Sequence, residues 1–171
     1  MTDGSEPPGD RSEVLRVDGP AGPTAAATHL VVGYDRHRAS DVALGVAIGL
    51  ATRLDAHLHV VHVIDADDLP DDPDAADWER AVTETVERER AAACARLAEL
   101  PGNWTYYARR GHPAHLLDAL AETYDASMIV IGAPRHGLQS LVERLLGASV
   151  SAHLVHHAHR PVLLVPAGPG D

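Results

Sequence analysis

The feature that most constrains the fold of this chain is a repeated switch between two hydrophobic periods. His29–Tyr34 and His57–Ile64 are short, nearly continuous apolar runs, which are typical of strands covered on both faces. Between them, Arg38–Leu54 has an apolar residue at every fourth position, which is the spacing of a stripe on a helix. Because parallel strands need a crossover between them, this alternation predicts an α/β fold with a parallel sheet and helices on both of its faces.

The rest of the chain repeats the alternation. Apolar spacing predicts a long helix over 78–100, followed by a third strand at 104–108, which is more polar and which we expect at an edge of the sheet. Pro113 suits the first turn of the next helix, because its missing N–H has no helical partner there. Residues 127–131 and Val162–Val165 complete a set of five predicted strands.

The ends of the chain differ from its middle. Residues 1–28 are rich in Gly, Pro, Asp and Glu and offer little to bury, which predicts a disordered extension, and 167–171 read as a loose tail. A single domain is therefore expected over 29–166. No apolar run approaches the ~18 residues that span a bilayer, and the start lacks the pattern of a signal peptide. With a single cysteine, Cys94, the chain fits a reducing cytoplasm and no membrane association.

Charge and motifs disfavour two classes of function. The net charge is −11, with 25 acidic residues against 14 arginines and no lysine, and the arginines are scattered, so nucleic-acid binding is not expected. The sequence contains no G-x-S-x-G, no G-x-x-x-x-G-K-[S/T], and no G-x-G-x-x-G after its first strand. We therefore expect no dedicated enzyme and no catalytic residues.

A ligand site is expected where the parallel strands end. Ligands of open α/β sheets bind beyond the carboxyl ends of the strands, at the point where the strand order reverses. This directs attention to the segments that follow Tyr34, Ile64 and Ile131.

The segment after Ile131 is the most informative of the three. It contains Gly132, Gly137 and Gly147, and glycines allow a phosphate to approach the backbone closely. A helix expected to begin near Ser149 would present unpaired N–H groups to an anion. Glycine and serine at such a junction are also common as plain turn and cap residues, so both interpretations stand on spacing alone.

Four segments together resemble the universal stress protein family. Residues 127–165, SMIVIGAPRHGLQSLVERLLGASVSAHLVHHAHRPVLLV, are similar to the C-terminal signature of that family. Residues 30–51 resemble its first strand and helix, 58–65 its second strand, and 111–132 its G-x-P-A helix and fourth strand. The resemblance covers 30–165, in the order that the family shows.

The resemblance implies a particular architecture and ligand. The family has the Rossmann-like fold of the adenine nucleotide alpha hydrolases, with a five-stranded parallel sheet of order 3-2-1-4-5. Its members commonly form homodimers through the last strand, here Val162–Val165. Its ATP-binding members use a G-2x-G-9x-G-[S/T] motif for the phosphates, and magnesium can accompany the nucleotide.

Carried over by position, the resemblance implies a set of site residues. The acid that ends strand one and the main chain that ends strand two, which receive the adenosine, correspond to Asp35 and Val63. Strand four contributes Ile131 and Gly132, and the phosphate loop corresponds to Gly137, Gly147, Ser149 and Val150.

The chain departs from this motif in two places. Four residues instead of two separate Gly132 from Gly137, and Ala148 is inserted between Gly147 and Ser149. Arg135 and His136 lie in the extension and could donate hydrogen bonds to phosphate in compensation.

Family members that lack the motif generally do not bind ATP. Two functions therefore stay open: an adenine-nucleotide-binding regulatory module, with slow hydrolysis not excluded, or a homodimer that acts by protein contact without nucleotide. An enzyme of the wider superfamily is a distant third, because neither an SGGxDS-like loop nor a HIGH motif occurs.

Asp35 and the histidines also have ordinary structural interpretations. An aspartate after a strand often forms a turn or caps the next helix, so Asp35 is either a turn residue or a ligand contact. His57 and His59 share one strand face, where buried histidines with hydrogen bonds are expected. His153 and His157 share one helix face, with His156 and His159 nearby, and we expect a solvated or subunit-facing surface there, not a metal site.

Overall fold

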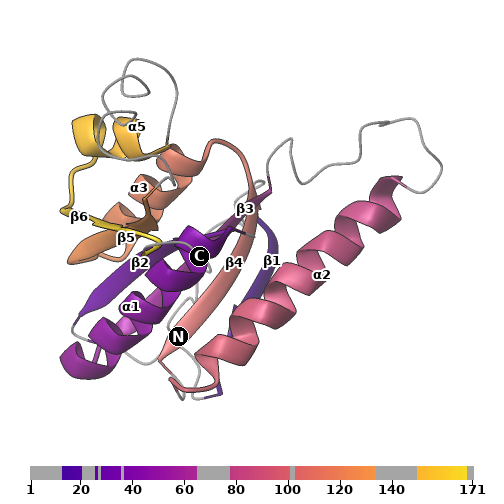
Figure 1. The fold of residues 1–171 in the computed structure, drawn as a ribbon, viewed down its shortest axis with the longest axis horizontal. Helices are drawn as coiled ribbons and strands as arrows, with labels where there is room; N and C mark the ends of the chain where they lie inside the picture. Colours follow the sequence, from indigo (N-terminus) through magenta and orange to yellow (C-terminus); the bar gives the residue numbers. More distant parts are fainter. Residues whose placement is uncertain are drawn as a thin grey trace, which may run out of the picture.

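The computed structural model describes residues 13–20, 26, 28–35, 37–64, 78–100, 103–133 and 150–168. Within these residues, strands and helices alternate along the chain from β2 onward (Figure 1). In order they are β1 Glu13–Asp18, β2 His29–Tyr34, α1 Arg38–Leu54, β3 His57–Ile64, α2 Trp78–Leu97, β4 Trp104–Arg110, α3 Pro113–Thr123, β5 Met128–Gly132, α5 Val150–His157 and β6 Val162–Val165. The predicted alternation of strands and helices is therefore confirmed.

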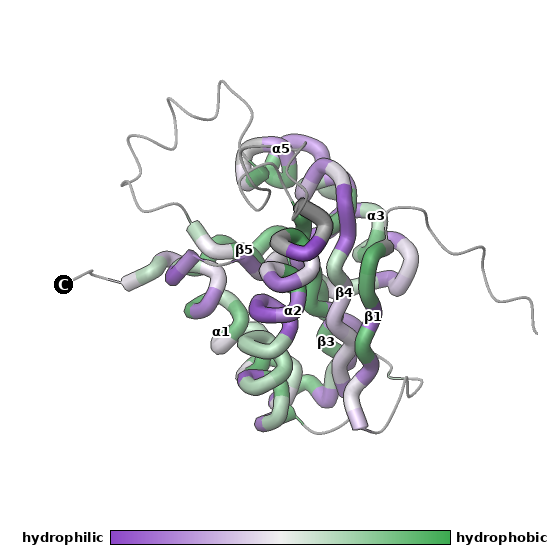
Figure 2. The backbone as a smooth tube through the Cα atoms, turned by 90° about the vertical axis from the view of Figure 1, so that its right-hand side faces the viewer, coloured by the Kyte–Doolittle hydropathy of each residue, from purple (hydrophilic) through white to green (hydrophobic). Residues whose placement is uncertain are grey.

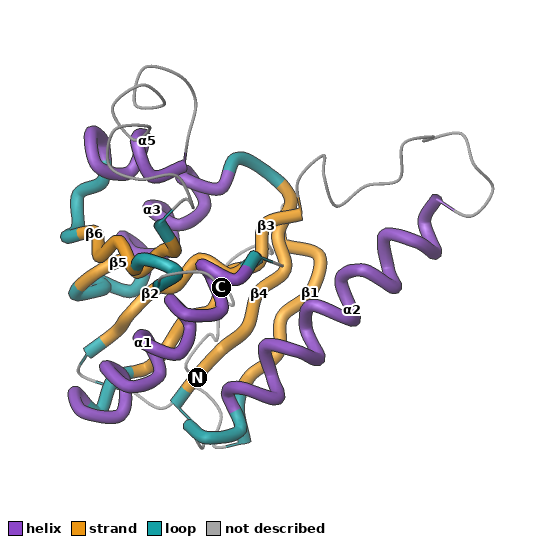
Figure 3. Tube along the Cα trace, viewed as in Figure 1, coloured by secondary structure: helices purple, strands orange, loops and turns teal. Residues whose placement is uncertain are grey.

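The strands form one six-stranded sheet of order β1-β4-β3-β2-β5-β6 (Figure 3). The pairs from β4 across to β6 are all parallel, and their order corresponds to the expected 3-2-1-4-5. The sixth strand, β1, pairs with β4 in the antiparallel direction. The sheet is therefore mixed, and the prediction of five strands in a wholly parallel sheet is wrong in that respect.

Strand β1 corrects, for residues 13–18, the prediction that residues 1–28 are a disordered extension. Residues 15–18 alternate, so that Leu15 and Val17 pack against the same apolar core as α1 and α2, while Arg16 and Asp18 belong to the other face. The ladder to β4 pairs Arg16 with Tyr107 and Asp18 with Thr105. Because β1 covers the outer side of β4, the prediction that β4 lies at an edge is wrong.

Helices cover both faces of the sheet and divide the core in two. On one face, α1 and α2 pack over strand residues such as Leu30, Val32 and Tyr106, all fully buried. On the other, α3 and α5 contribute Leu117 and Leu154 to a second core. In Figure 2, hydrophilic residues colour much of α2.

The helices in the described ranges are too short or too polar to cross a bilayer.

Candidate functional site

The carboxyl ends of the central strands bring the predicted adenosine residues to one edge of the sheet. Strand β2 lies between β3 and β5, and Tyr34 pairs with His62, so Asp35 lies level with Val63 on β3. Val32 pairs with Val130, which places the end of β2 beside the end of β5 at Gly132. The chain leaves β2 through α1 on one face and reaches β5 through α3 on the other (Figure 1). This is a point of strand-order reversal, where ligands of such sheets bind.

Asp35 forms a turn and remains accessible. One carboxylate oxygen accepts a hydrogen bond from the His37 N–H at 2.7 Å and lies 3.3 Å from His37 Nδ1. The Ser40 hydroxyl donates to the Asp35 carbonyl at 2.7 Å and accepts from the Asp35 N–H at 3.1 Å. The turn predicted as the ordinary interpretation is thus present. Since the side chain is still 56% exposed, that turn also leaves the carboxylate free to meet a ligand.

Gly132 is required by packing, whatever it does for a ligand. A Cβ at this position would lie 2.5 Å from the carbonyl carbon of Ala39 and 2.8 Å from the N of Ser40. The first turn of α1 therefore packs directly on the end of β5, and that contact needs glycine.

Val63 and Ile131 have side chains directed into the core between the sheet and α3. Ile131 is 5% exposed, and Val63 is half-buried against the same cluster. Any contact they make with a ligand at the strand ends would therefore use the main chain, as the resemblance implies for Val63.

Most of the predicted phosphate loop lies outside the described residues. This applies to Arg135, His136, Gly137, Gly147 and Ser149. Val150 is described: it is the first residue of α5 and packs, half-buried, against the core of the α3 face. Because α5 leads back to the start of β6, its first turn points toward the edge where the parallel strands end.

The sheet holds a group of histidines, which we call the sheet histidines: the buried His57 and His59 and the partly buried His29. His57 and His59 are each 2% exposed, and their rings lie 4.5 Å apart. His59 Nδ1 lies 3.2 Å from the Tyr107 hydroxyl, and its Nε2 lies 3.1 Å from His29 Nδ1. The prediction of buried, hydrogen-bonded histidines on one face is confirmed.

Two further contacts extend this network to β1, a connection that sequence reasoning missed. His57 Nε2 lies 3.0 Å from the Thr105 hydroxyl, which donates to an Asp18 carboxylate oxygen at 2.7 Å. Burial lowers the pKa of His57, and burial together with the neighbouring His57 and His29 lowers the pKa of His59 to about 2. Both rings are therefore neutral at physiological pH, which suits a structural role.

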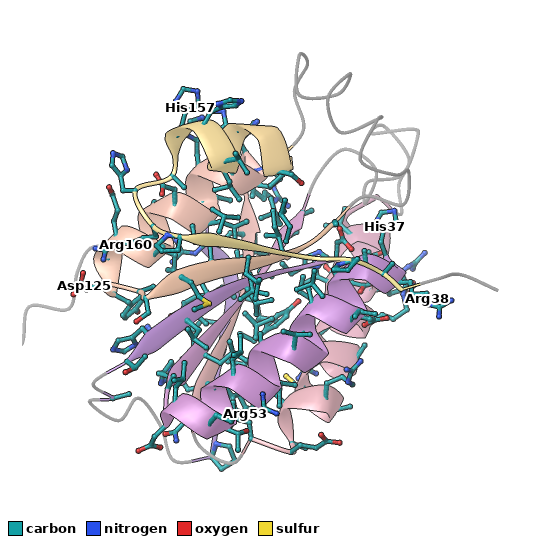
Figure 4. All side chains as sticks on the ribbon, turned by 60° about the vertical axis from the view of Figure 1, so that its left-hand side comes forward. His37, Arg38, Arg53, Asp125, His157 and Arg160 are labelled. Atoms are coloured by element: carbon teal, nitrogen blue, oxygen red, sulfur yellow. The ribbon has the colours of Figure 1, made fainter. Side chains whose placement is uncertain are left out.

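A second group, the surface histidines, lies where α3 and α5 meet: His112, His115, His153 and His157. The ring centroids of His153 and His157 are 4.8 Å apart, so the expected shared helix face is confirmed. Figure 4 shows His157 at the outer side of α5. His112 and His115 come from the start of α3, and sequence reasoning missed them. Their spacing of three residues was the available signal, but only the packing of α3 on α5 brings them to His153.

Next to the surface histidines, three side chains have their ligand atoms within 4.8 Å of one another: Asp118, Glu122 and His159. His159 Nδ1 lies 3.4 Å from an Asp118 oxygen and 3.1 Å from a Glu122 oxygen. His159 is 70% exposed, and the two acids lie one turn apart on α3.

Comparison with known proteins decides the family. The model of the universal stress protein family matches residues 27–166, which is most of the chain. The chain belongs to the universal stress protein family. Universal stress protein MJ0531 of Methanocaldococcus jannaschii is 30% identical over 134 residues, covering 74% of this chain and 76% of that protein. The predicted family membership is thus confirmed, and β1 lies before the part that the family model matches.

Solved universal stress proteins share the fold. A structure from Burkholderia pseudomallei is 27% identical with a TM-score of 0.59, and the match covers 84% of this chain and 99% of that one. A universal stress protein solved in complex with cAMP is 24% identical with a TM-score of 0.54, covering 84% of this chain and 100% of that one.

Proposed function

We propose that this universal stress protein binds an adenine nucleotide at the edge where its parallel strands end, and that it acts through binding and not as a dedicated enzyme. The observation that carries the proposal is the convergence of Asp35, the main chain at Val63 and the close-packed Gly132 at the point where the strand order reverses. An exposed carboxylate held in a fixed turn is suited to accept hydrogen bonds from ribose hydroxyls.

Structural neighbours support the same ligand class. Solved universal stress proteins include one in complex with cAMP, one from Archaeoglobus fulgidus in complex with dAMP and one from Arabidopsis thaliana with AMP bound. These ligands share adenine, a pentose and one phosphate. The adenosine half of the proposed site is the half whose residues are described here, whereas ATP with Mg²⁺ stays our prediction from the glycine motif.

Isothermal titration of the purified chain with ATP and Mg²⁺, AMP and cAMP tests the proposal. Asp35→Ala removes the carboxylate that accepts from the His37 N–H in the turn and that would accept from a ribose hydroxyl. Asp35→Asn keeps an oxygen that can accept in the turn but removes the charge. We expect Asp35→Ala to weaken binding about 10-fold or more and Asp35→Asn to weaken it less, because hydrogen bonds to a charged group contribute ~1.5–3 kcal/mol.

Glu99→Gln, an exposed substitution in the turn just after α2, is the matched control and should bind as the wild type does. Absence of binding heat from correctly folded wild-type protein with all three nucleotides would reject the proposal.

A second candidate is a homodimer that acts by protein contact without nucleotide, and the edge strand β6 favours it. Among the described residues β6 pairs only with β5, so its outer edge is left open to another strand. Leu163 on β6 is 37% exposed, and Val155 on the neighbouring α5 is 55% exposed. We propose that the chain forms a cytoplasmic homodimer through β6. This pairing is compatible with both candidates, and only the second candidate requires that no nucleotide is bound.

Light scattering of the eluted protein tests the dimer. Leu163→Glu should convert dimer to monomer, because it places a charge in the proposed interface. Val14→Glu, on the opposite edge strand β1 where Val14 is 46% exposed, should leave the mass unchanged. A monomeric wild type at micromolar concentration, or dissociation by Val14→Glu alone, would count against pairing through β6. An acid extract of the pure protein separates the two candidate functions: the first predicts copurified nucleotide and the second predicts none.

A further inference from the structure

We propose that the surface histidines form a binding site for a divalent late first-row transition metal ion, with Zn²⁺ as the reference ion. His112 and His115 of the α3 start and His153 of α5 are the proposed core ligands, and His157 is the fourth.

The distances between the rings fit a shared ion. The centroids of His112, His115 and His153 form a triangle with sides of 4.9, 5.5 and 4.6 Å. Two imidazoles bound to one tetrahedral zinc at ~2.0–2.1 Å have centroids roughly 5 Å apart. The planes of the three rings are inclined to one another by 56° to 68°, so the rings are not stacked as flat plates. The nitrogens of these rings do not yet converge within 4.8 Å of one another, so binding of one ion requires the side chains to rotate inward.

The backbone holds these side chains in place from two helices. His112 precedes Pro113 at the start of α3, and His115 follows one turn later. His153 and His157 lie one turn apart on α5, with centroids 4.8 Å apart. The two helices pack through Leu117 and Leu154, which are 2% and 1% exposed, so the two pairs of ligands face each other across a rigid contact.

The chemistry of the donors favours such an ion. Imidazole is a preferred ligand of Zn²⁺, Ni²⁺ and Cu²⁺, and it must be neutral to bind them. Hard cations such as Ca²⁺ prefer oxygen ligands and are not expected at this cluster.

The neighbouring Asp118, Glu122 and His159 are a rival set of ligands, because their atoms already converge. A histidine between two carboxylates is, however, an ordinary exposed ion pair, and it explains the observed distances without a metal. The surface histidines offer imidazole nitrogens alone, the donors that late first-row transition metal ions prefer, which is why we assign the ion to them.

The test uses the untagged full chain with ZnCl₂ alone in isothermal titration, and with Co²⁺ in visible absorption, where tetrahedral nitrogen ligation gives intense bands. We expect His115→Ala and His153→Ala each to weaken Zn²⁺ binding at least about 10-fold, since even loss of a residue that only supports a ligand costs ~10–100-fold. Both variants should also lose the tetrahedral Co²⁺ bands.

Two controls keep the result specific. His156→Ala removes an exposed histidine of α5 whose ring centroid lies 6.5 Å from that of His157 but which is not one of the proposed ligands. His159→Ala breaks the rival set. Both should bind Zn²⁺ as the wild type does. Zn²⁺ should raise the Tm of the wild type and of both controls, but not that of a His115→Ala, His153→Ala double variant.

Loss of binding in His159→Ala with retention in His115→Ala would overturn the assignment in favour of the carboxylate set. Equal Zn²⁺ affinity in the wild type and the double variant would overturn it altogether. Because the readouts are metal affinity, absorption and Tm, they do not depend on nucleotide binding.

Discussion

The sheet histidines and the surface histidines are the same residue type at similar spacing, yet their surroundings give them different chemistry. Neighbouring rings lie 4.5 to 5.8 Å apart in the sheet group and 4.6 to 5.5 Å apart in the surface group. In the sheet, His57 and His59 are buried and their ring nitrogens meet hydroxyls and a third histidine. On the α3–α5 surface, three of the four rings are exposed. Burial with fixed partners makes a histidine part of the scaffold, and exposure leaves it available to a ligand.

The largest expected difference between the groups is in stability. His59→Ala would leave a cavity and remove the partner of the Tyr107 hydroxyl and of His29, so the free energy of unfolding should fall by about 3 kcal/mol or more. His157→Ala, at the exposed surface, should change it by less than about 0.5 kcal/mol without added metal. Urea denaturation followed by circular dichroism measures both changes in the free energy of unfolding. Equal changes would show that the two groups do not differ in their contribution to stability.

The next effect is the response to acid. In the folded chain the pKa values of His57 and His59 lie below the ordinary 6.5, and that of His59 falls to about 2. Below pH 6.5 the unfolded chain therefore binds more protons at these two residues than the folded chain does. Their stabilising contribution is therefore complete above pH 6.5 and is lost as the pH falls. His59 alone should cost up to about 2 kcal/mol by pH 5, before most carboxylates titrate.

Denaturation curves at pH 7.5, 6.5, 5.7 and 5.0 measure this loss. His59→Gln should flatten the dependence on pH, and His157→Gln should leave it as in the wild type. A wild-type stability that stays constant over this range would show that the buried rings do not titrate as their surroundings require.

The smallest effect concerns the link between the sheet histidines and β1. Asp18→Ala removes the acceptor of the Thr105 hydroxyl, which in turn meets His57, and should cost about 1–2 kcal/mol. Arg16→Ala is the matched control on the same strand: its 3.2 Å ion pair with Asp18 is partly exposed, so less than about 1 kcal/mol is expected. Hydrogen exchange of the β4 amides adds a local readout. If both substitutions lower the free energy of unfolding equally, the connection through Thr105 does not contribute to stability.

Elements that depend on interactions between residues close together in the chain were predicted from the sequence, and elements that depend on distant residues were not. The continuous apolar runs of β2 and β3 and the four-residue spacing of α1 are local signals, and they predicted these elements with correct bounds. Strand β1 was missed because the alternation covers only four residues, 15–18, in a segment rich in proline and glycine, and the partner strand β4 lies about ninety positions later. The turn at Asp35 was one of two interpretations, and only its bond to the His37 N–H decided that it forms.

The sequence by itself determined the α/β class, the family, the position of Asp35 after β2 and the shared face of His57 and His59. Each of these depends on periodicity or on residues close together in the chain. The tertiary structure alone decided that Gly132 must accommodate the first turn of α1, that β1 closes the side of β4, and that His112 and His115 meet His153. Those contacts join residues tens of positions apart, and their geometry follows from how helices and strands pack, which no local pattern encodes.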